Sequence, residues 1–252
     1  MNPIDLNCDL AEGTLESEIV RDCELMRYIS SANLCGGAYA GSRRALERCV
    51  FAAREQGVAI GAHPGHADPA HFGRRPLPLS PSELHSLLAG QLEYLADMAE
   101  KANAQLQHVK LHGALYHQTA HDPTLAEQVI QTMTQFDPRL LLYAPAPSQL
   151  AIIAHQAGLH VVPEFFLDRQ YTAQGDLVSR DRPAAFVSDP ELAVGRLATL
   201  LQSGVVETIE GTWLPMRCET ACFHSDHPQA LAFAQVVHQQ LQELGIPIRA
   251  PN

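Results

Sequence analysis

Three histidines within nine residues distinguish the segment 58–75. An apolar run at 58–62 ends at His63, and a polar loop that contains His66 and His71 follows it. A run that stops at a histidine and opens into such a loop is typical of α/β proteins, which build sites where strands end. Imidazoles at this position could hold a metal ion, transfer a proton or bind an anion. A solvated histidine-rich loop without a function is the other interpretation.

Polar side chains also follow the other apolar runs of the chain. They are Asn7, Asp9 and Glu12; Asn33; Lys110 and His112; Glu164, Asp168 and Arg169; and His224 with Asp226. In a parallel barrel the carboxyl ends of all strands meet at one mouth, so these residues would converge there. Taken singly, Asp9 could cap a turn and Lys110 could lie on the surface. Together, His63, His112 and His224 at strand ends favour a functional site.

Three chemistries fit this set of residues. A carboxylate with imidazoles, such as Asp9 with His63, could hold zinc or a similar ion that activates water. Alternatively, Asp9 or Glu12 could act as a general base without a metal, while Lys110 and the histidines stabilise negative charge on oxygen. The cluster could also bind an acidic metabolite without turning it over. Neither GxxxxGK[ST] nor GxGxxG occurs, so a nucleotide, if used, is not held by a standard phosphate loop.

Alternating strands and helices are expected to position these residues. Seven apolar runs, each followed by a helical pattern, are spread over 252 residues without a domain-length break or an internal repeat. Strands that alternate with helices specify a parallel sheet with crossover connections. Seven such units favour a closed or nearly closed (β/α) barrel over an open sheet. We therefore expect an α/β protein with one seven-stranded barrel domain over residues 1–252.

Capping residues mark the expected helix boundaries. Ser80, Pro81 and Glu83 combine an N-cap, a first-turn proline and a capping box. Further helix starts are expected at about residue 18, at Asp122, Ser148 and Asp189, and at His227 with Pro228. The polar stretch 170–188 predicts a long loop, and 204–213 a short extra hairpin or strand. His108 and His160 are expected to flank strands without a function.

Composition restricts the class of protein and partner. The net charge of −11 and the lack of a basic stripe argue against nucleic acid as a partner. No run of 18 apolar residues occurs and no signal-peptide pattern begins the sequence, so we expect neither a membrane span nor secretion. Six scattered cysteines without a CxxC pair indicate reduced thiols and a cytoplasmic protein. Arg74 and Arg75 form an isolated pair suited to one carboxylate or phosphate.

Five motifs run the length of the chain in a recognisable order. They read DLNCDLAEG at 5–13, SANLCGGAYAGS at 31–42, GVAIGAHP at 57–64 followed by Asp68 and FGRR at 72–75, HVKLHGALY at 108–116, and TACFHSD at 220–226. This series resembles DLNxDxGEG, SANIACGFHAGD, GVxIGAHPxxxDxxxFGR, HVKPHGALY and TVCxHGD of the A subunit of the bacterial ATP-dependent 5-oxoprolinase. That family is also called LamB/YcsF.

The resemblance implies a fold, a reaction and partners. The fold is a barrel related to the glycoside hydrolase/deacetylase superfamily. In the reaction, 5-oxoproline, ATP and water give glutamate, ADP and phosphate, and the chain works together with 5-oxoprolinase subunits B and C. ATP would be a co-substrate handled through the complex. Opening a lactam requires an activated carbonyl, an activated water or phosphate, and stabilisation of an oxyanion.

The candidate residues take roles on this hypothesis. Those assigned to catalysis are Asp9, Glu12, His63, Lys110 and His112, and those assigned to the substrate are Asn7, Asn33, Arg74, Arg169, His224 and Asp226. Asp9 and Glu12 are candidate bases, and Lys110 and His112 are candidate stabilisers of the oxyanion. His63 is a candidate acid, base or, together with Asp9, metal ligand. His66 and His71 fall outside the family pattern, and we expect them to be loop residues.

Two departures from the family pattern follow the second strand. Tyr39 and Ser42 stand where the motif has histidine and aspartate. A phenol titrates at about pH 10, so tyrosine is a poor metal ligand at neutral pH. These changes leave three alternatives: a working oxoprolinase component with a modified pocket, a divergent metal-dependent deacetylase-like hydrolase that needs neither ATP nor partners, and a non-catalytic metabolite-binding subunit.

Overall fold

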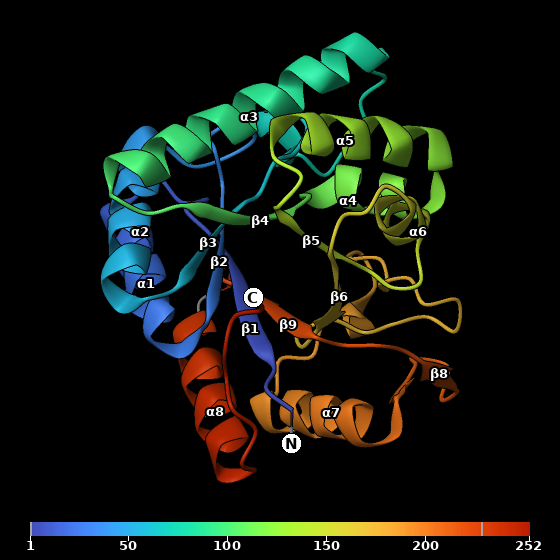
Figure 1. The fold of residues 1–252 in the computed structure, drawn as a ribbon. Helices are drawn as coiled ribbons and strands as arrows, with labels where there is room; N and C mark the ends of the chain where they lie inside the picture. The colour runs from blue at the N-terminus through green and yellow to red at the C-terminus, as the bar shows by residue number, and fades with distance from the viewer. Residues whose placement is uncertain (1, 228) are drawn as a thin grey trace.

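Seven parallel strands close into a barrel that is surrounded by helices (Figure 1). The computed structural model describes residues 2–227 and 229–252. The barrel strands are β1 (Asp5–Leu10), β2 (Ser31–Leu34), β3 (Ala59–Ala62), β4 (Leu106–Lys110), β5 (Leu141–Ala144), β6 (Val161–Phe166) and β9 (Thr220–His224). The last strand, β9, pairs with both β6 and β1 and so closes the ring. The predicted seven-stranded α/β barrel is confirmed.

The helices begin where the sequence places capping residues. They are α1 (Glu16–Leu25), α2 (Arg43–Gln56), α3 (Pro81–Lys101), α4 (Gly113–His121), α5 (Pro123–Phe136), α6 (Gln149–Gln156), α7 (Pro190–Ser203) and α8 (Ala230–Glu243). Before α3, Ser80 and Glu83 form the predicted capping box, in which each side chain accepts the other residue's main-chain N–H. Asp122, Ser148 and Asp189 cap α5, α6 and α7, as predicted. Within the described part of the chain, no helix combines the length and apolarity that a membrane span requires.

Three segments differ from the prediction or complete it. The helix α4 was not predicted, because it begins directly after His112 without a capping side chain. The last helix begins at Ala230, after the expected start at His227 with Pro228; Pro228 itself lies outside the described residues. The segment 204–213 contributes to an antiparallel hairpin of β7 (Val205–Glu207) and β8 (Trp213–Pro215), apart from the barrel.

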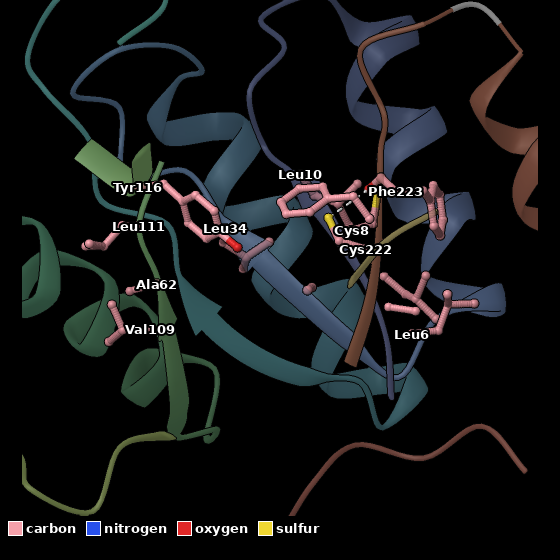
Figure 2. Packing of buried hydrophobic residues seen from close by; sticks show 14 of the residues in the cluster. Leu6, Cys8, Leu10, Leu34, Ala62, Val109, Leu111, Tyr116, Cys222 and Phe223 are labelled. Carbon is pink, nitrogen blue, oxygen red and sulfur yellow. Dashed lines mark hydrogen bonds between the residues drawn. The ribbon is translucent and has the colours of Figure 1, made fainter. Parts of the chain in front are cut away.

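The apolar core lies between the strands and the surrounding helices. Leu6, Cys8 and Leu10 of β1 belong to this core, together with Phe223 of β9 (Figure 2). Successive residues of a strand face opposite sides of a sheet, so the residues between them, Asp5 among them, point into the barrel. The barrel therefore keeps its apolar side chains outside and its polar ones inside.

The interior of the barrel is filled by hydrogen-bonded polar groups. Near its amino end, Asp5 accepts hydrogen bonds from Ser30, Ser31 and Thr220, at 2.6–2.7 Å. These bonds offset part of the rise in the pKa of Asp5 that burial causes. A buried carboxyl is tolerated at such a position because its oxygens are paired.

His108 is part of this interior, which corrects the expectation that it merely flanks a strand. Its ring stacks on that of Tyr143 with centroids 4.1 Å apart, and its Nε2 lies 2.8 Å from Asn33 Oδ1. Burial, and then the charge of Lys110, lower the pKa of His108 to about 3, so the ring is neutral. On the adjacent strand, a Cβ at Gly61 would lie 2.0 Å from His108 Nε2, so only glycine leaves room for this ring.

Candidate active site

A cavity of about 410 Å³ opens at the carboxyl ends of the strands. Its lining includes six residues of the predicted site: Asp9, His63, Arg74, Lys110, Arg169 and His224. The lining also includes residues that were not predicted, among them Tyr116 and Arg180. The volume suits one small molecule.

Lys110 lies buried at the end of β4, next to two carboxyl groups. Its Nζ is 2.7 Å from Asp9 Oδ1, 3.2 Å from Glu164 Oε1 and 2.9 Å from Cys222 Sγ. Burial alone would lower the pKa of Lys110, but Asp9, followed by Cys222 and Glu164, holds the pKa well above its usual value. Lys110 is therefore a fixed ammonium ion in a nearly dry site.

Asn7 and Asn33 hold Asp9 in place from below. Asn33 Nδ2 donates to Asp9 Oδ1 at 2.8 Å and to Asn7 Oδ1 at 2.7 Å, while Asn7 Nδ2 donates to Thr220 Oγ1 at 2.6 Å. Both asparagines are fully buried and neither lines the cavity. The geometry thus favours a positioning role for them over the substrate contact expected from the sequence.

His63 and His112 face each other through their inner nitrogens. His63 Nδ1 lies 2.7 Å from the carbonyl oxygen of Lys110, and His112 Nε2 lies 2.9 Å from that of Phe72. A carbonyl only accepts, so both outer nitrogens carry protons. The inner nitrogens, His63 Nε2 and His112 Nδ1, are 2.9 Å apart, and His63 Nε2 is also 3.2 Å from Asp9 Oδ2. Their lone pairs converge on a point that requires a proton or a cation.

A metal ion is compatible with this arrangement. Asp9, His63 and His112 each offer one ligand atom, and these atoms lie within 4.8 Å of one another. A carboxylate with two imidazoles suits zinc, and main-chain bonds to the outer nitrogens fix the rings as in many metal sites. The sequence named Asp9 and His63 for this role, and the structure adds His112. One proton shared by the imidazoles satisfies the same lone pairs.

Tyr39 completes the environment of Glu12, behind His112. Its hydroxyl donates to Glu12 Oε1 at 2.9 Å, and its ring stacks on His112 with centroids 3.7 Å apart. Burial, and then the charge of Asp9, raise the pKa of Glu12 to about 8, although the Tyr39 hydroxyl acts to lower it. The second departure from the family pattern has a local explanation. Ser42 caps α2 through Ala45 N, and serine and aspartate are both good N-caps.

His224 has an orienting carboxylate that the sequence analysis did not assign. Asp168 Oδ2 accepts from His224 Nδ1 at 2.8 Å and from its main-chain N at 3.0 Å. Burial acts to raise the pKa of Asp168, but the charge of His224 and these bonds bring it below its usual value. His224 Nε2 then faces the cavity, 3.7 Å from Asp9 Oδ2. A histidine fixed by a buried carboxylate is suited to proton transfer.

Two arginines predicted to bind substrate are already engaged with protein groups. Arg169 Nη2 donates to Val178 O at 2.6 Å and its Nε to Ala185 O at 3.4 Å, so it ties the loop 170–188 to the end of β6. Arg74 Nη2 lies 2.7 Å from Asp226 Oδ2. Asp226 does not line the cavity.

Several residues of the site were missed by the sequence analysis. Glu164 contacts Lys110 and accepts a hydrogen bond from Tyr116 Oη at 2.8 Å. Both residues carried a signal, because Glu164 follows an apolar run and Tyr116 closes a family motif. His66 and His71 pair with Gln118 and Asp68, and neither lines the cavity, in agreement with their expected place in the loop.

Comparison with known proteins settles the family. The model of the LamB/YcsF family matches residues 4–252. The chain belongs to the LamB/YcsF family. The lactam utilization protein from Thermus thermophilus is similar to this LamB/YcsF chain in both sequence and structure. The identity is 35% over 99% of this chain and 100% of that chain, with a TM-score of 0.91.

More distant structures share the barrel with this LamB/YcsF chain. A putative cellobiose-phosphate cleavage protein from Enterococcus faecalis V583 has 12% identity and a TM-score of 0.55, covering 98% of this chain and 96% of that one. The catalytic domain of a peptidoglycan N-acetylglucosamine deacetylase from Eubacterium rectale ATCC 33656 has 9% identity and a TM-score of 0.50, with coverages of 99% and 88%. At these identities the likeness concerns the fold alone, which is deacetylase-like.

Proposed function

We propose that this chain is the lactam-opening component of an ATP-dependent 5-oxoprolinase. It would convert 5-oxoproline to glutamate together with subunits B and C. One observation carries the proposal: a buried ammonium group, Lys110, lies with Asp9, His63 and His224 at the floor of a cavity sized for a small molecule. Family membership and the likeness to a lactam utilization protein support it.

Lys110 would stabilise the oxyanion. Attack on the lactam carbonyl transfers negative charge to its oxygen, and a fixed ammonium group in a dry site stabilises that charge without reorganisation. Asp9 and Glu164 keep Lys110 charged in the resting site. The network below Asp9 keeps its carboxylate in place, so the ammonium group has little freedom to turn away.

His224 and His63 would move the protons. The lactam nitrogen must gain a proton as the ring opens, and the attacking water or phosphate must lose one. His224 presents Nε2 to the cavity on the Asp168 carboxylate, whereas His63 can pass a proton to His112 and Glu12 behind it. ATP would activate the amide or the nucleophile through the complex, since this chain has no standard phosphate loop.

Turnover with and without partners tests this function. We expect 5-oxoproline-dependent ATP hydrolysis when the chain is combined with candidate B and C subunits, and none with any component alone. Release of glutamate by this chain alone in the absence of ATP would contradict the proposal.

A metal-dependent, deacetylase-like hydrolase is the second candidate, favoured by the convergent lone pairs of His63 and His112. Asp9, His63 and His112 would hold the ion, which when bound supplies a Lewis acid and an activated water. Metal analysis of the purified protein tests this candidate. Less than about a tenth of an equivalent of zinc or another divalent metal rejects it, because a dedicated site binds tightly.

A further inference from the structure

The cavity has two walls of different chemistry. The inner wall, at the strand ends, presents Lys110 with Asp9, and His224 with its partner Asp168. Each positive group there has a carboxylate beside it. The outer wall is built from loops and α4, and its polar groups are Arg74, His117, Arg169, Ser179 and Arg180. That wall carries three guanidinium groups and no carboxylate of its own.

Arg180 is the least satisfied cation of the outer wall. Arg169 is committed to two main-chain carbonyls, and Arg74 takes Asp226 Oδ2 at 2.7 Å. Arg180 Nη1 reaches the same Asp226 oxygen at only 3.5 Å, and this is its one ion pair among the described residues. Since a guanidinium group has five N–H donors, most of those on Arg180 remain available to a ligand.

Nearby groups register the positive potential of this wall. Burial, and then the charges of Arg169 and Arg180, lower the pKa of His117 to about 4, although Asp176 opposes this effect. Burial and the charge of Arg180 likewise lower the pKa of Arg169 to about 10. Like charges are therefore crowded at the outer wall, and an anion placed there would relieve the crowding.

The guanidinium group of Arg180 is also held in place. Its Cζ lies 5.5 Å from the ring centroid of Phe186, and the Cζ of Arg169 lies 5.3 Å from the same centroid. The side chain of Arg180 is 30% exposed, so it is covered on most sides but reachable from the cavity. Because Arg169 fixes the loop that carries Arg180, little conformational freedom is left to lose on binding.

We propose that Arg180, with Arg74 beside it, forms an anion subsite that takes the carboxylate of a small cyclic amide and displaces Asp226 from Arg180. The proposal rests on the proposed function, because that function supplies an amide carbonyl for Lys110. Asp9 on the inner wall would repel a carboxylate, so the anionic end of the ligand lies outward. A guanidinium group matches a carboxylate through two parallel N–H donors, which favours arginine for this contact.

Calorimetric binding to the full chain tests the subsite. The ligands are 5-oxoproline, 2-pyrrolidone, which has the same ring without the carboxylate, and inorganic phosphate. The variants are Arg180→Gln and the control Arg182→Gln. Arg182 is exposed on the same loop and does not line the cavity. Thermal unfolding of each variant confirms that the loop change leaves the barrel intact.

The subsite predicts one pattern of affinities. Arg180→Gln should weaken 5-oxoproline binding by about 10- to 100-fold, the range for a lost charged hydrogen-bonded pair. The same variant should change 2-pyrrolidone binding by less than about twofold, and Arg182→Gln should change neither. Equal losses for both ring ligands, equal effects of the two variants, or no binding of 5-oxoproline to the wild-type chain would overturn the subsite. So would binding of phosphate that depends on Arg180 while 5-oxoproline binding does not.

Turnover separates this result from the proposed function. Carboxylate-dependent binding without ATP-dependent turnover in the presence of B and C retains the subsite and rejects the oxoprolinase. Turnover with the same KM for 5-oxoproline in Arg180→Gln and wild type retains the oxoprolinase and rejects the subsite.

Discussion

Replacing Lys110 by methionine should weaken the fold as well as abolish turnover. Lys110→Met keeps the length of the side chain but leaves the carboxyl groups of Asp9 and Glu164 buried without their cation. Removing one partner of a buried ion pair typically costs about 3–5 kcal/mol. From the sequence alone, a Lys110 variant was expected to fold normally, so this prediction depends on the burial that the structure shows.

The remaining contacts of the two carboxyl groups place the cost at the lower end of that range. Asp9 keeps Asn33 and His63, and Glu164 keeps Asn7 and Tyr116. We therefore expect a loss of about 3 kcal/mol at pH 7. A domain with about 5–15 kcal/mol of stability survives this loss, so the variant remains folded and can be assayed.

The cost should depend on pH in a defined direction. In the wild type, His63 and Lys110 outweigh burial and hold the pKa of Asp9 well below its usual value. This stabilisation is present above the unfolded pKa of about 4 and is lost as the pH falls. Without Lys110, a buried carboxyl can take up a proton instead. The difference between variant and wild type should thus widen as the pH rises from 5 to 8, by at most about 1.4 kcal/mol per unit.

Urea unfolding at several pH values measures this difference. Lys101→Met is the matched control, because Lys101 is an exposed lysine at the end of α3 that pairs with Asp97. The control should leave the unfolding midpoint unchanged. A loss below about 1 kcal/mol for Lys110→Met, or a loss independent of pH, would refute the buried ion pair.

Three further substitutions probe the groups around the cavity. Glu12→Gln mimics a protonated carboxyl: because burial and then Asp9 raise the pKa of Glu12 to about 8, the wild type should lose stability relative to this variant as the pH rises from 4 through 8, and parallel stability profiles in urea would contradict this. Asp168→Asn should lower turnover by about 100-fold without a change in melting temperature, since it removes the carboxylate that orients His224; unaltered turnover would remove this pair from the mechanism. Tyr39→Phe should cost about 1–3 kcal/mol in urea unfolding, because Glu12 loses a donor, and a cost no larger than that of Tyr39→His would show that the hydroxyl contributes nothing specific.

The parts of the fold that local sequence determines could be predicted. Capping side chains such as Ser80 and Asp122 act within one helical turn, so their pattern is visible in a few residues. The strand-end residues converge because parallel barrels place all carboxyl ends together. The helix α4 lacks both signals, and its start at Gly113 depends on contacts with the distant loop that contains Gly73.

The site could be predicted only in part, for two different reasons. His108 and Cys222 share the inward face of their strands with Lys110 and His224, two residues away in each case, so the alternation of strand residues could have found them. Arg180 carried no such signal. Its place in the cavity follows from the way Arg169 draws the long loop back over the mouth, which is a contact between main-chain and side-chain atoms that no periodicity encodes.

The contact between Gly61 and His108 restricts the routes by which this barrel can evolve. A side chain at position 61 cannot appear first, because its Cβ would occupy the space of the imidazole. Loss of the imidazole first would leave Asn33 without one of its partners and open a hole among polar groups. Each single step passes through a damaged protein, so the two positions are expected to change together or not at all across the family.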